Sequence, residues 1–185
     1  MAVARRPVPT CLLLGAAGGG KSLVARRLRH IRGTGRDGTG LPGAGGRHAR
    51  TSVGTNLSDL RLPRRARLRE LGGCMGPIWP SYYGECSAVL FVVDAANPTQ
   101  VSSSCVQLLS VLSAAPLAAV PVLVLFNKID LPCYMSLAEM KSLFRMQDIV
   151  SCATQPITML ETSARDGTGL ADVLRWLRAT LGDAR

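Results

Sequence analysis

The chain has few of the features that mark secreted, zinc-binding or membrane-spanning proteins. No two of its six cysteines form a C-x-x-C pair, and the two histidines, His30 and His48, lie in basic stretches. A zinc site is therefore not expected, and the thiols are expected to be reduced, as they are in the cytosol. The longest apolar run, 114–126, is interrupted by Pro116 and Pro121 and is too short to cross a bilayer.

Targeting and lipidation signals are also lacking. Residues 1–10 contain no hydrophobic region long enough for a signal peptide. Position 2 is alanine rather than glycine, and the last four residues, Gly-Asp-Ala-Arg, include no cysteine, so neither myristoylation nor prenylation has its acceptor. We therefore expect a cytoplasmic protein that forms a single domain over residues 1–185, a length sufficient to bury a full core.

The net charge of +10 is concentrated in the first third of the chain. Up to Arg69, 15 lysines and arginines accompany only Asp37 and Asp59, which gives +13, whereas the residues from Glu70 onward carry −3. A basic surface of this kind attracts an anionic membrane, nucleic acid or an acidic partner, or stays solvated without a dedicated ligand. Because no nucleic-acid recognition motif accompanies it, we expect no specific nucleic-acid binding and at most a weak contact with an anionic membrane surface.

The segment 15–22 predicts a phosphate site. It reads GAAGGGKS, which fits G-x-x-x-x-G-K-[ST], and it lies between a short apolar strand and a helix, a context that a chance glycine linker would lack. Glycines let successive N–H groups point at phosphate oxygens, and the following helix presents its positive end. The lysine can reach the β- and γ-phosphates, and the serine can ligate Mg²⁺. The predicted phosphate-binding residues are Gly15, Ala16, Ala17, Gly18, Gly19, Gly20, Lys21 and Ser22.

Strands and helices alternate along the chain. Segments 52–57 and 66–71 alternate apolar and polar residues, whereas 88–93 and 120–126 are continuously apolar, as strands buried on both faces are. Further elements are expected as a strand at 155–162 and helices at 99–113, 136–145 and 170–181. This order predicts a three-layer α/β fold, the P-loop NTPase fold, with a six-stranded, mostly parallel sheet covered by helices on both faces. Segment 32–50, with seven glycines, is predicted to be a flexible Gly/Arg-rich loop.

A second and a third motif indicate which base is bound. Asn127-Lys128-Ile129-Asp130 directly follows an apolar strand. An aspartate at this place can accept two hydrogen bonds from guanine, whereas adenine would leave a buried carboxylate unpaired, which argues against a P-loop ATPase or kinase. After the sixth strand, Ser163 and Ala164 can supply a backbone N–H to the guanine oxygen. Each motif alone also fits an ordinary polar turn, but three in order at strand ends predict a guanine-nucleotide site.

With these motifs the sequence resembles a Ras-superfamily small GTPase, and most of all the ADP-ribosylation factor-like branch, from Val8 to Leu181. The branch reads Asp-Val-Gly-Gly-Gln where this chain has 70–74 (ELGGC), followed by Pro77-Ile-Trp79 and Tyr82-Tyr83. The resemblance implies binding of GTP and GDP with Mg²⁺ as a molecular switch, with effector proteins and an exchange factor or GTPase-activating protein as partners. It also implies that Gly73 lies near the γ-phosphate, while the three aromatic residues are expected to pack first of all in the core.

Departures from the family pattern leave the catalytic outcome open. Cys74 replaces the glutamine that orients the attacking water, and a thiol is too weak a hydrogen-bonding group to replace an amide, so no catalytic residue is assigned with certainty. Glu70 replaces the aspartate that holds Mg²⁺ through water, and Ser52, with Thr51 beside it, takes the place of the metal-binding threonine. Two functions remain: a GTPase with weak intrinsic hydrolysis, assisted by partners, or a GTP-binding scaffold that does not hydrolyse.

Overall fold

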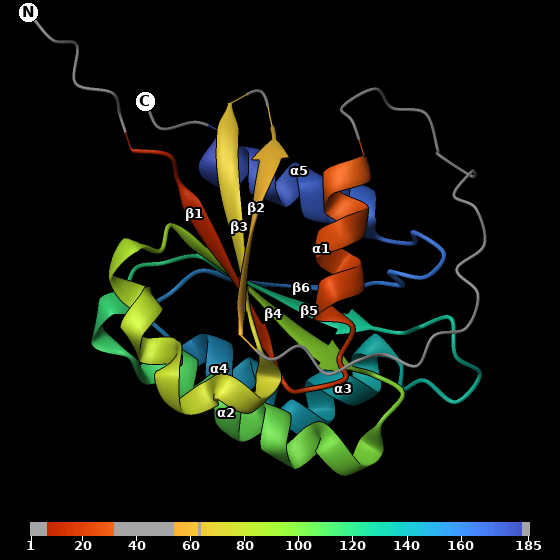
Figure 1. Cartoon of the computed structure of the whole chain (residues 1–185). Coiled ribbons are helices and arrows are strands. Elements are labelled where there is room, and N and C mark those ends of the chain that lie inside the picture. Colours follow the sequence, from red (N-terminus) through yellow and green to blue (C-terminus); the bar gives the residue numbers. More distant parts are fainter. Residues whose placement is uncertain (1–6, 32–53, 63, 183–185) are drawn as a thin grey trace, which may run out of the picture.

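The computed structural model describes residues 7–31, 54–62 and 64–182, which contain one six-stranded sheet of order β2-β3-β1-β4-β5-β6 (Figure 1). The strands are β1 (Thr10–Gly15), β2 (Thr55–Arg61), β3 (Arg65–Leu71), β4 (Ala88–Asp94), β5 (Val122–Asn127) and β6 (Ile157–Glu161). The helices are α1 (Lys21–His30), α2 (Val101–Ser113), α3 (Leu137–Phe144), α4 (Met146–Cys152) and α5 (Leu170–Leu181). Three 3₁₀ segments are η1 (Gly73–Glu85), η2 (Pro98–Gln100) and η3 (Ala115–Leu117).

Five of the six strands are parallel, which brings their carboxyl ends to one edge. Strand β1 pairs in parallel with β3 and β4, β4 with β5, and β5 with β6, while β2 pairs antiparallel with β3. Every residue of β4 and β5 is buried, as their continuous apolar sequences require for strands covered on both faces. The predicted α/β fold with a mostly parallel six-stranded sheet is confirmed.

The sheet separates two apolar cores. On one face, α1 and α5 pack through residues such as Val24, Leu28 and Leu177. On the other face, η1, α2, α3 and α4 cover the sheet, and their core includes Trp79 and Tyr83 (Figure 1). Both aromatic side chains are buried as expected, at 2% and 4% exposure. Of the described helices, none is long and apolar enough to span a membrane.

Several boundaries differ from those expected from the sequence. The second strand was predicted at 52–57, but β2 begins at Thr55, after Gly54 with φ +106°, and its register is set by pairing with β3. Strand β5 begins at Val122 rather than at Val120, because Pro121 has no N–H for the ladder. The predicted loop 32–50 lies outside the described residues.

Helix boundaries follow their caps. Helix α3 begins after Ser136, whose hydroxyl accepts the Glu139 N–H at 3.3 Å, as the S-x-x-E pattern predicts. Helix α4, which the sequence analysis did not identify, follows at once because Arg145, with φ +52°, turns the chain between the two helices. Helix α5 spans the expected residues.

Candidate functional site

The predicted phosphate-binding segment connects the carboxyl end of β1 to the start of α1. Gly20 caps α1 with φ +93°, and a Cβ there would lie 2.6 Å from Asn127 Nδ2. Glycine is therefore required both by the backbone conformation and by the closeness of the β5 end. The segment follows β1 and lies near the end of β5, at the edge of the sheet where the carboxyl ends of the parallel strands meet. Open α/β sheets bind ligands at this edge.

The buried Lys21 side chain bonds to the backbone at the start of the loop. Its ammonium donates to Gly15 O at 3.0 Å and to Ala16 O at 2.8 Å, and the residue is only 5% exposed. Burial lowers the pKa of Lys21 from 10.5 to about 8, although the neighbouring Glu70 and Cys74 act in the opposite direction. A phosphate anion would remove much of this cost, because it would supply the opposite charge that the buried ammonium lacks.

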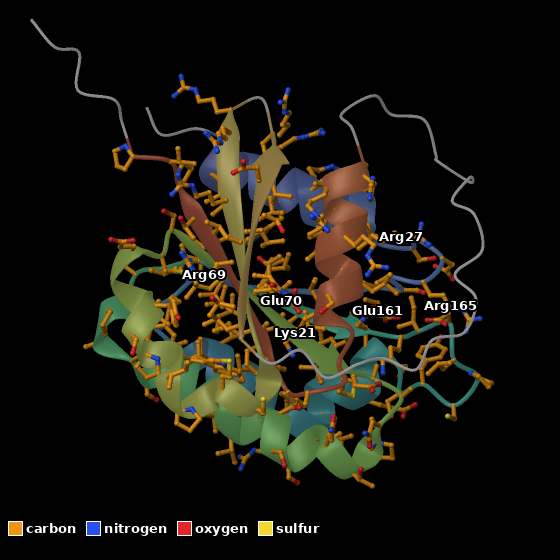
Figure 2. All side chains as sticks on the ribbon, in the orientation of Figure 1. Lys21, Arg27, Arg69, Glu70, Glu161 and Arg165 are labelled. Atoms are coloured by element: carbon orange, nitrogen blue, oxygen red, sulfur yellow. The ribbon has the colours of Figure 1, made fainter. Side chains whose placement is uncertain are left out.

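Ser22, the second residue of α1, lies against the end of β3. Its hydroxyl donates to Glu70 Oε1 at 2.5 Å, and Glu70 is 5% exposed. Figure 2 shows Glu70 close to Lys21 at the centre of the molecule. The Glu70 carboxylate is therefore in direct contact with the serine that is predicted to bind Mg²⁺.

Mg²⁺ fits these residues as an ion that is coordinated partly by the protein and partly by other ligands. The Ser22 hydroxyl and the Glu70 carboxylate are hard oxygen ligands of the kind Mg²⁺ takes. Within the described ranges, no cluster of three His, Cys, Asp or Glu side chains could hold a metal ion without further ligands. Phosphate oxygens and water would have to complete the coordination. Ser52 and Thr51, the expected alternative ligands, lie outside the described residues.

Gly73 brings the start of η1 against the loop. A Cβ on this residue would lie 2.2 Å from Ala17 N and 2.6 Å from Ala16 C, so only glycine allows this approach. The Trp79 indole N–H donates to Gly72 O at 3.1 Å and holds the preceding peptide in place. Gly73 thus lies beside the segment that is predicted to bind phosphate, and Cys74 next to it is exposed.

Asn127 ties three segments together at the end of β5. Its amide nitrogen donates to Gly19 O at 2.9 Å, while its Oδ1 accepts from Thr162 Oγ1 at 3.2 Å and from Ala164 N at 3.1 Å. Asn127 and Thr162 are almost completely buried, at 1% and 0% exposure. The Ala164 N–H therefore already has a partner within the protein, and a guanine oxygen would share this proton with Asn127.

The remaining motif residues, Lys128 and Asp130, follow β5 at the same edge of the sheet. Lys128, which has φ +69°, donates to Gly18 O at 2.6 Å and forms an ion pair with Asp94 at 2.9 Å. Asp130 Oδ1 accepts the Ser163 hydroxyl at 2.8 Å, which leaves the second carboxylate oxygen for a ligand. Asp130 itself is exposed, so burial of its carboxylate would have to come from a bound base rather than from the protein.

Several contacts at this site have no counterpart in the sequence motifs. Among them are the Asp94 ion pair, the Thr162 bond to Asn127 and the bond of Ser22 to Glu70. The apolar strands that lead to Asp94 and Thr162 were recognisable in the sequence. The available signal for these two residues was therefore their position at the carboxyl end of a strand in a parallel sheet. Their partners lie too far away in the sequence to be read from it.

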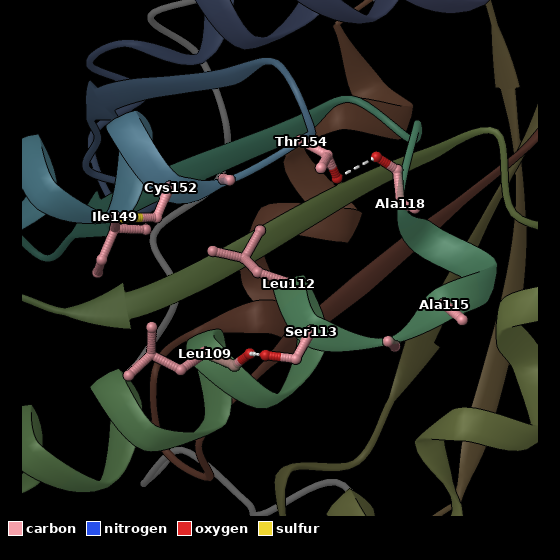
Figure 3. A pocket seen from close by; sticks show the side chains of 10 residues that line it. Leu109, Leu112, Ser113, Ala115, Ala118, Ile149, Cys152 and Thr154 are labelled. Atoms are coloured by element: carbon pink, nitrogen blue, oxygen red, sulfur yellow. Dashed lines mark hydrogen bonds between the residues drawn. The ribbon is translucent and has the colours of Figure 1, made fainter.

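A cavity lies away from these residues. It has a volume of about 380 Å³ and opens between the end of α2, η3 and α4, where Leu109, Leu112 and Ile149 line it (Figure 3). The hydroxyls of Ser113 and Thr154 at its rim donate to the carbonyls of Leu109 and Ala118. None of the motif residues lines this cavity.

Comparison with known proteins agrees with this geometry. Residues 65–181 match the sequence model of the ADP-ribosylation factor family. The chain is 61% identical to human ADP-ribosylation factor-like protein 16 over 170 residues, which covers 92% of this chain and 85% of the relative. It is 29% identical to ADP-ribosylation factor-like protein 1 of Drosophila melanogaster over 173 residues, covering 92% and 87%.

A solved structure gives the same fold. The Arl6 BBS3 small GTPase from Trypanosoma brucei, with bound nucleotide analogue GppNp, superposes with a TM-score of 0.78 at 19% identity, covering 95% of this chain and 98% of that one. This likeness concerns the fold alone. The residues matched by the family model, 65–181, include the Asn127–Asp130 motif but not the loop 15–22. The similarity to the human relative extends over 92% of the chain. The chain belongs to the ADP-ribosylation factor family of small GTPases.

Proposed function

We propose that this protein binds GTP and GDP together with Mg²⁺ and acts as a molecular switch with slow intrinsic hydrolysis. The observation that carries the proposal is the convergence of the loop 15–22 and the motif 127–130. Asn127 and Lys128 bond directly to the loop carbonyls of Gly19 and Gly18. A phosphate site and a base site are thereby held in one rigid unit.

The proposed roles follow from these contacts. The N–H groups of 15–22 and the Lys21 ammonium hold the phosphates, and the Gly73 N–H approaches the third phosphate. Asp130 reads the ring N–H and the exocyclic amine of guanine, while Ser163 and Ala164 lie beside the base oxygen. Ser22 ligates Mg²⁺, with Ser52 as the second proposed protein ligand. Magnesium supplies charge neutralisation at the phosphates when it is bound.

Guanine specificity can be tested at Asp130. In Asp130→Asn the remaining carbonyl oxygen can still accept the Ser163 hydroxyl, so the fold should be preserved while one acceptor for the base becomes a donor. GTP affinity should fall at least about tenfold, and relative affinity for xanthine nucleotides should rise. Asp148→Asn, an exposed aspartate on α4, is the matched control. Equal affinity of the unmutated protein for ATP and GTP would refute the assignment, and identifying the nucleotide released on denaturation would test it directly.

A GTP-binding scaffold without hydrolysis is the second candidate function, and Cys74 is the observation that favours it. The exposed thiol stands beside Gly73, where the resemblance implies an amide that positions water. Weak hydrolysis implies that partner proteins set the lifetime of each state. We accordingly propose an effector and an exchange factor or GTPase-activating protein as partners. Single-turnover hydrolysis of the purified protein separates the two functions.

The β2–β3 hairpin supports a weak contact with anionic membrane surfaces. It carries Arg61, Arg64, Arg65, Arg67 and Arg69, and within the described part of the chain Arg65 alone among them forms an ion pair, with Asp59 at 2.8 Å. Figure 2 shows side chains that end in nitrogen projecting around the tip of the hairpin. In a cytoplasmic protein, each arginine near an anionic surface would contribute about 1 kcal/mol. Cosedimentation with phosphatidylserine vesicles that disappears as salt rises is expected, and salt-independent sedimentation would contradict it.

A further inference from the structure

The backbone carbonyls of the loop 15–20 each accept a hydrogen bond. Lys21 donates to the first two, Lys128 and Asn127 donate to Gly18 O and Gly19 O, and Val24 N–H donates to Gly20 O at 3.0 Å. The remaining carbonyl, that of Ala17, accepts from the side-chain amide of Gln100 at 3.3 Å. The donors Lys21, Asn127 and Lys128 belong to the sequence motifs described above, whereas Gln100 belongs to none of them.

Gln100 is well placed to hold this carbonyl. It is the last residue of η2, directly before α2, and it is partly buried. Its backbone N–H donates to Asn97 O at 3.2 Å, and Asn97 caps the same turn by accepting the Thr99 N–H at 3.2 Å. The turn therefore fixes the backbone from which the amide reaches the loop.

A fixed carbonyl also fixes the next N–H. The peptide bond is planar and trans, so the C=O of Ala17 and the N–H of Gly18 point in opposite directions. Gly18 has φ +79°, and a Cβ built on it would meet no atom within 4 Å. Gly73 packs against the N and Cα of Ala17, but no atom fills the space where a Cβ of Gly18 would lie, so the hydrogen bond from Gln100 to Ala17 O orients the Ala17–Gly18 peptide.

We propose that Gln100 is a positioning residue that holds the Ala17–Gly18 peptide so that the Gly18 N–H faces the phosphates of the bound nucleotide. This inference rests on the proposed function for its effect on nucleotide retention. The hydrogen bond from Gln100 to Ala17 O is itself a property of the protein without nucleotide. Gln100 therefore acts through the loop and does not touch the ligand.

The experiment measures dissociation of a fluorescent GDP from four variants of the full chain. Gln100→Ala removes the donor and should speed dissociation by about threefold to tenfold. Gln100→Glu keeps the shape of the side chain but places a carboxylate against the Ala17 carbonyl. It should therefore speed GDP dissociation at least as much as Gln100→Ala does. Gln100→Arg keeps N–H donors and should restore slow release in part. Gln147→Ala, an exposed glutamine on α4, is the matched control and should not change the rate.

A second measurement separates positioning from general destabilisation. NMR relaxation of the nucleotide-free protein should show a lower order parameter for the Gly18 N–H in Gln100→Ala and Gln100→Glu, with unfolding temperatures close to that of the unmutated protein. Unchanged dissociation with an unchanged Gly18 order parameter would overturn the proposal, as would a loss of stability that accounts for the faster release. If the unmutated protein retains no guanine nucleotide, the proposed function fails. The Gly18 order parameter then tests by itself whether Gln100 holds the Ala17–Gly18 peptide, and an unchanged value overturns the proposal.

Discussion

The buried Lys21 ammonium predicts that nucleotide affinity depends on pH. Its pKa of about 8 in the free protein is set by burial, and a bound phosphate should return it to at least its usual range. If only the protonated lysine binds phosphate well, GDP affinity should fall as pH rises through this pKa. Between about pH 7.4 and about pH 8.8 the loss should be about sixfold.

The stability of the nucleotide-free protein should change in the opposite direction. The folded pKa of about 8 lies below the unfolded value of 10.5, so the unfolded chain binds more protons between them and stability rises with pH. Over the same pH range Lys21 alone should contribute a gain of about 1 kcal/mol, which the buried thiols of Cys11 and Cys86 reduce because burial raises their pKa values above 9.0. Measurements should stop below pH 9, because burial raises the pKa of Cys86 from 9.0 to about 11, and this thiol makes the folded state less stable above its unfolded pKa.

Three measurements check this prediction. Isothermal titration with GDP across the range gives the affinity, and urea unfolding without nucleotide gives the stability. Lys21→Met should abolish the rise in stability with pH, and the ¹³Cε resonance of Lys21 should titrate near pH 8 only when nucleotide is absent. A GDP affinity that stays constant over this range, or a Lys21 resonance that does not move, would refute the reasoning.

Three further predictions concern Asn127, Gly73 and Cys74. Asn127→Ala leaves Gly19 O, the Thr162 hydroxyl and Ala164 N–H without their partner and should cost about 3 kcal/mol in urea unfolding; a loss below about 1 kcal/mol would contradict its role as a buried tie. Gly73→Ala should lower the unfolding temperature and weaken nucleotide binding, because its Cβ would meet the Ala17 backbone at 2.2 Å, whereas Gly84→Ala, which meets no atom within 4 Å, should change little. Intrinsic hydrolysis should be no faster than roughly one turnover per hour, and Cys74→Gln should raise it in part; fast turnover that survives Cys74→Ala would show that another group positions the water.

The parts of the fold that were predictable are those dictated by burial on both faces. The apolar runs that became β4 and β5 were recognisable because such strands contain almost no polar residues. Helix α4 was missed because it has seven residues, too few for a helical period to stand out. The start of β2 depends on pairing with β3, which local sequence does not encode.

The candidate site shows the same division. Motif residues could be named from the sequence because their spacing along the chain is short and fixed. Gln100, Asp94 and Thr162 could not, because each acts through a partner on another element. Gln100 meets Ala17 across 83 positions, and Asp94 meets Lys128 across 34. Only the folded sheet brings these pairs together.

The tie between Asn127 and Gly19 has a consequence for synthesis of the chain. The two residues are 108 positions apart, so the phosphate loop leaves the ribosome long before the side chain that holds it. Contacts of such long range form late in folding, because closing the intervening loop costs entropy before any contact repays it. The partner of Asn127 at Ala164 comes later still. Nascent chains that end before Asn127 and Ala164 should therefore have no affinity for nucleotide. GTP binding would then occur at the end of folding rather than guide its beginning.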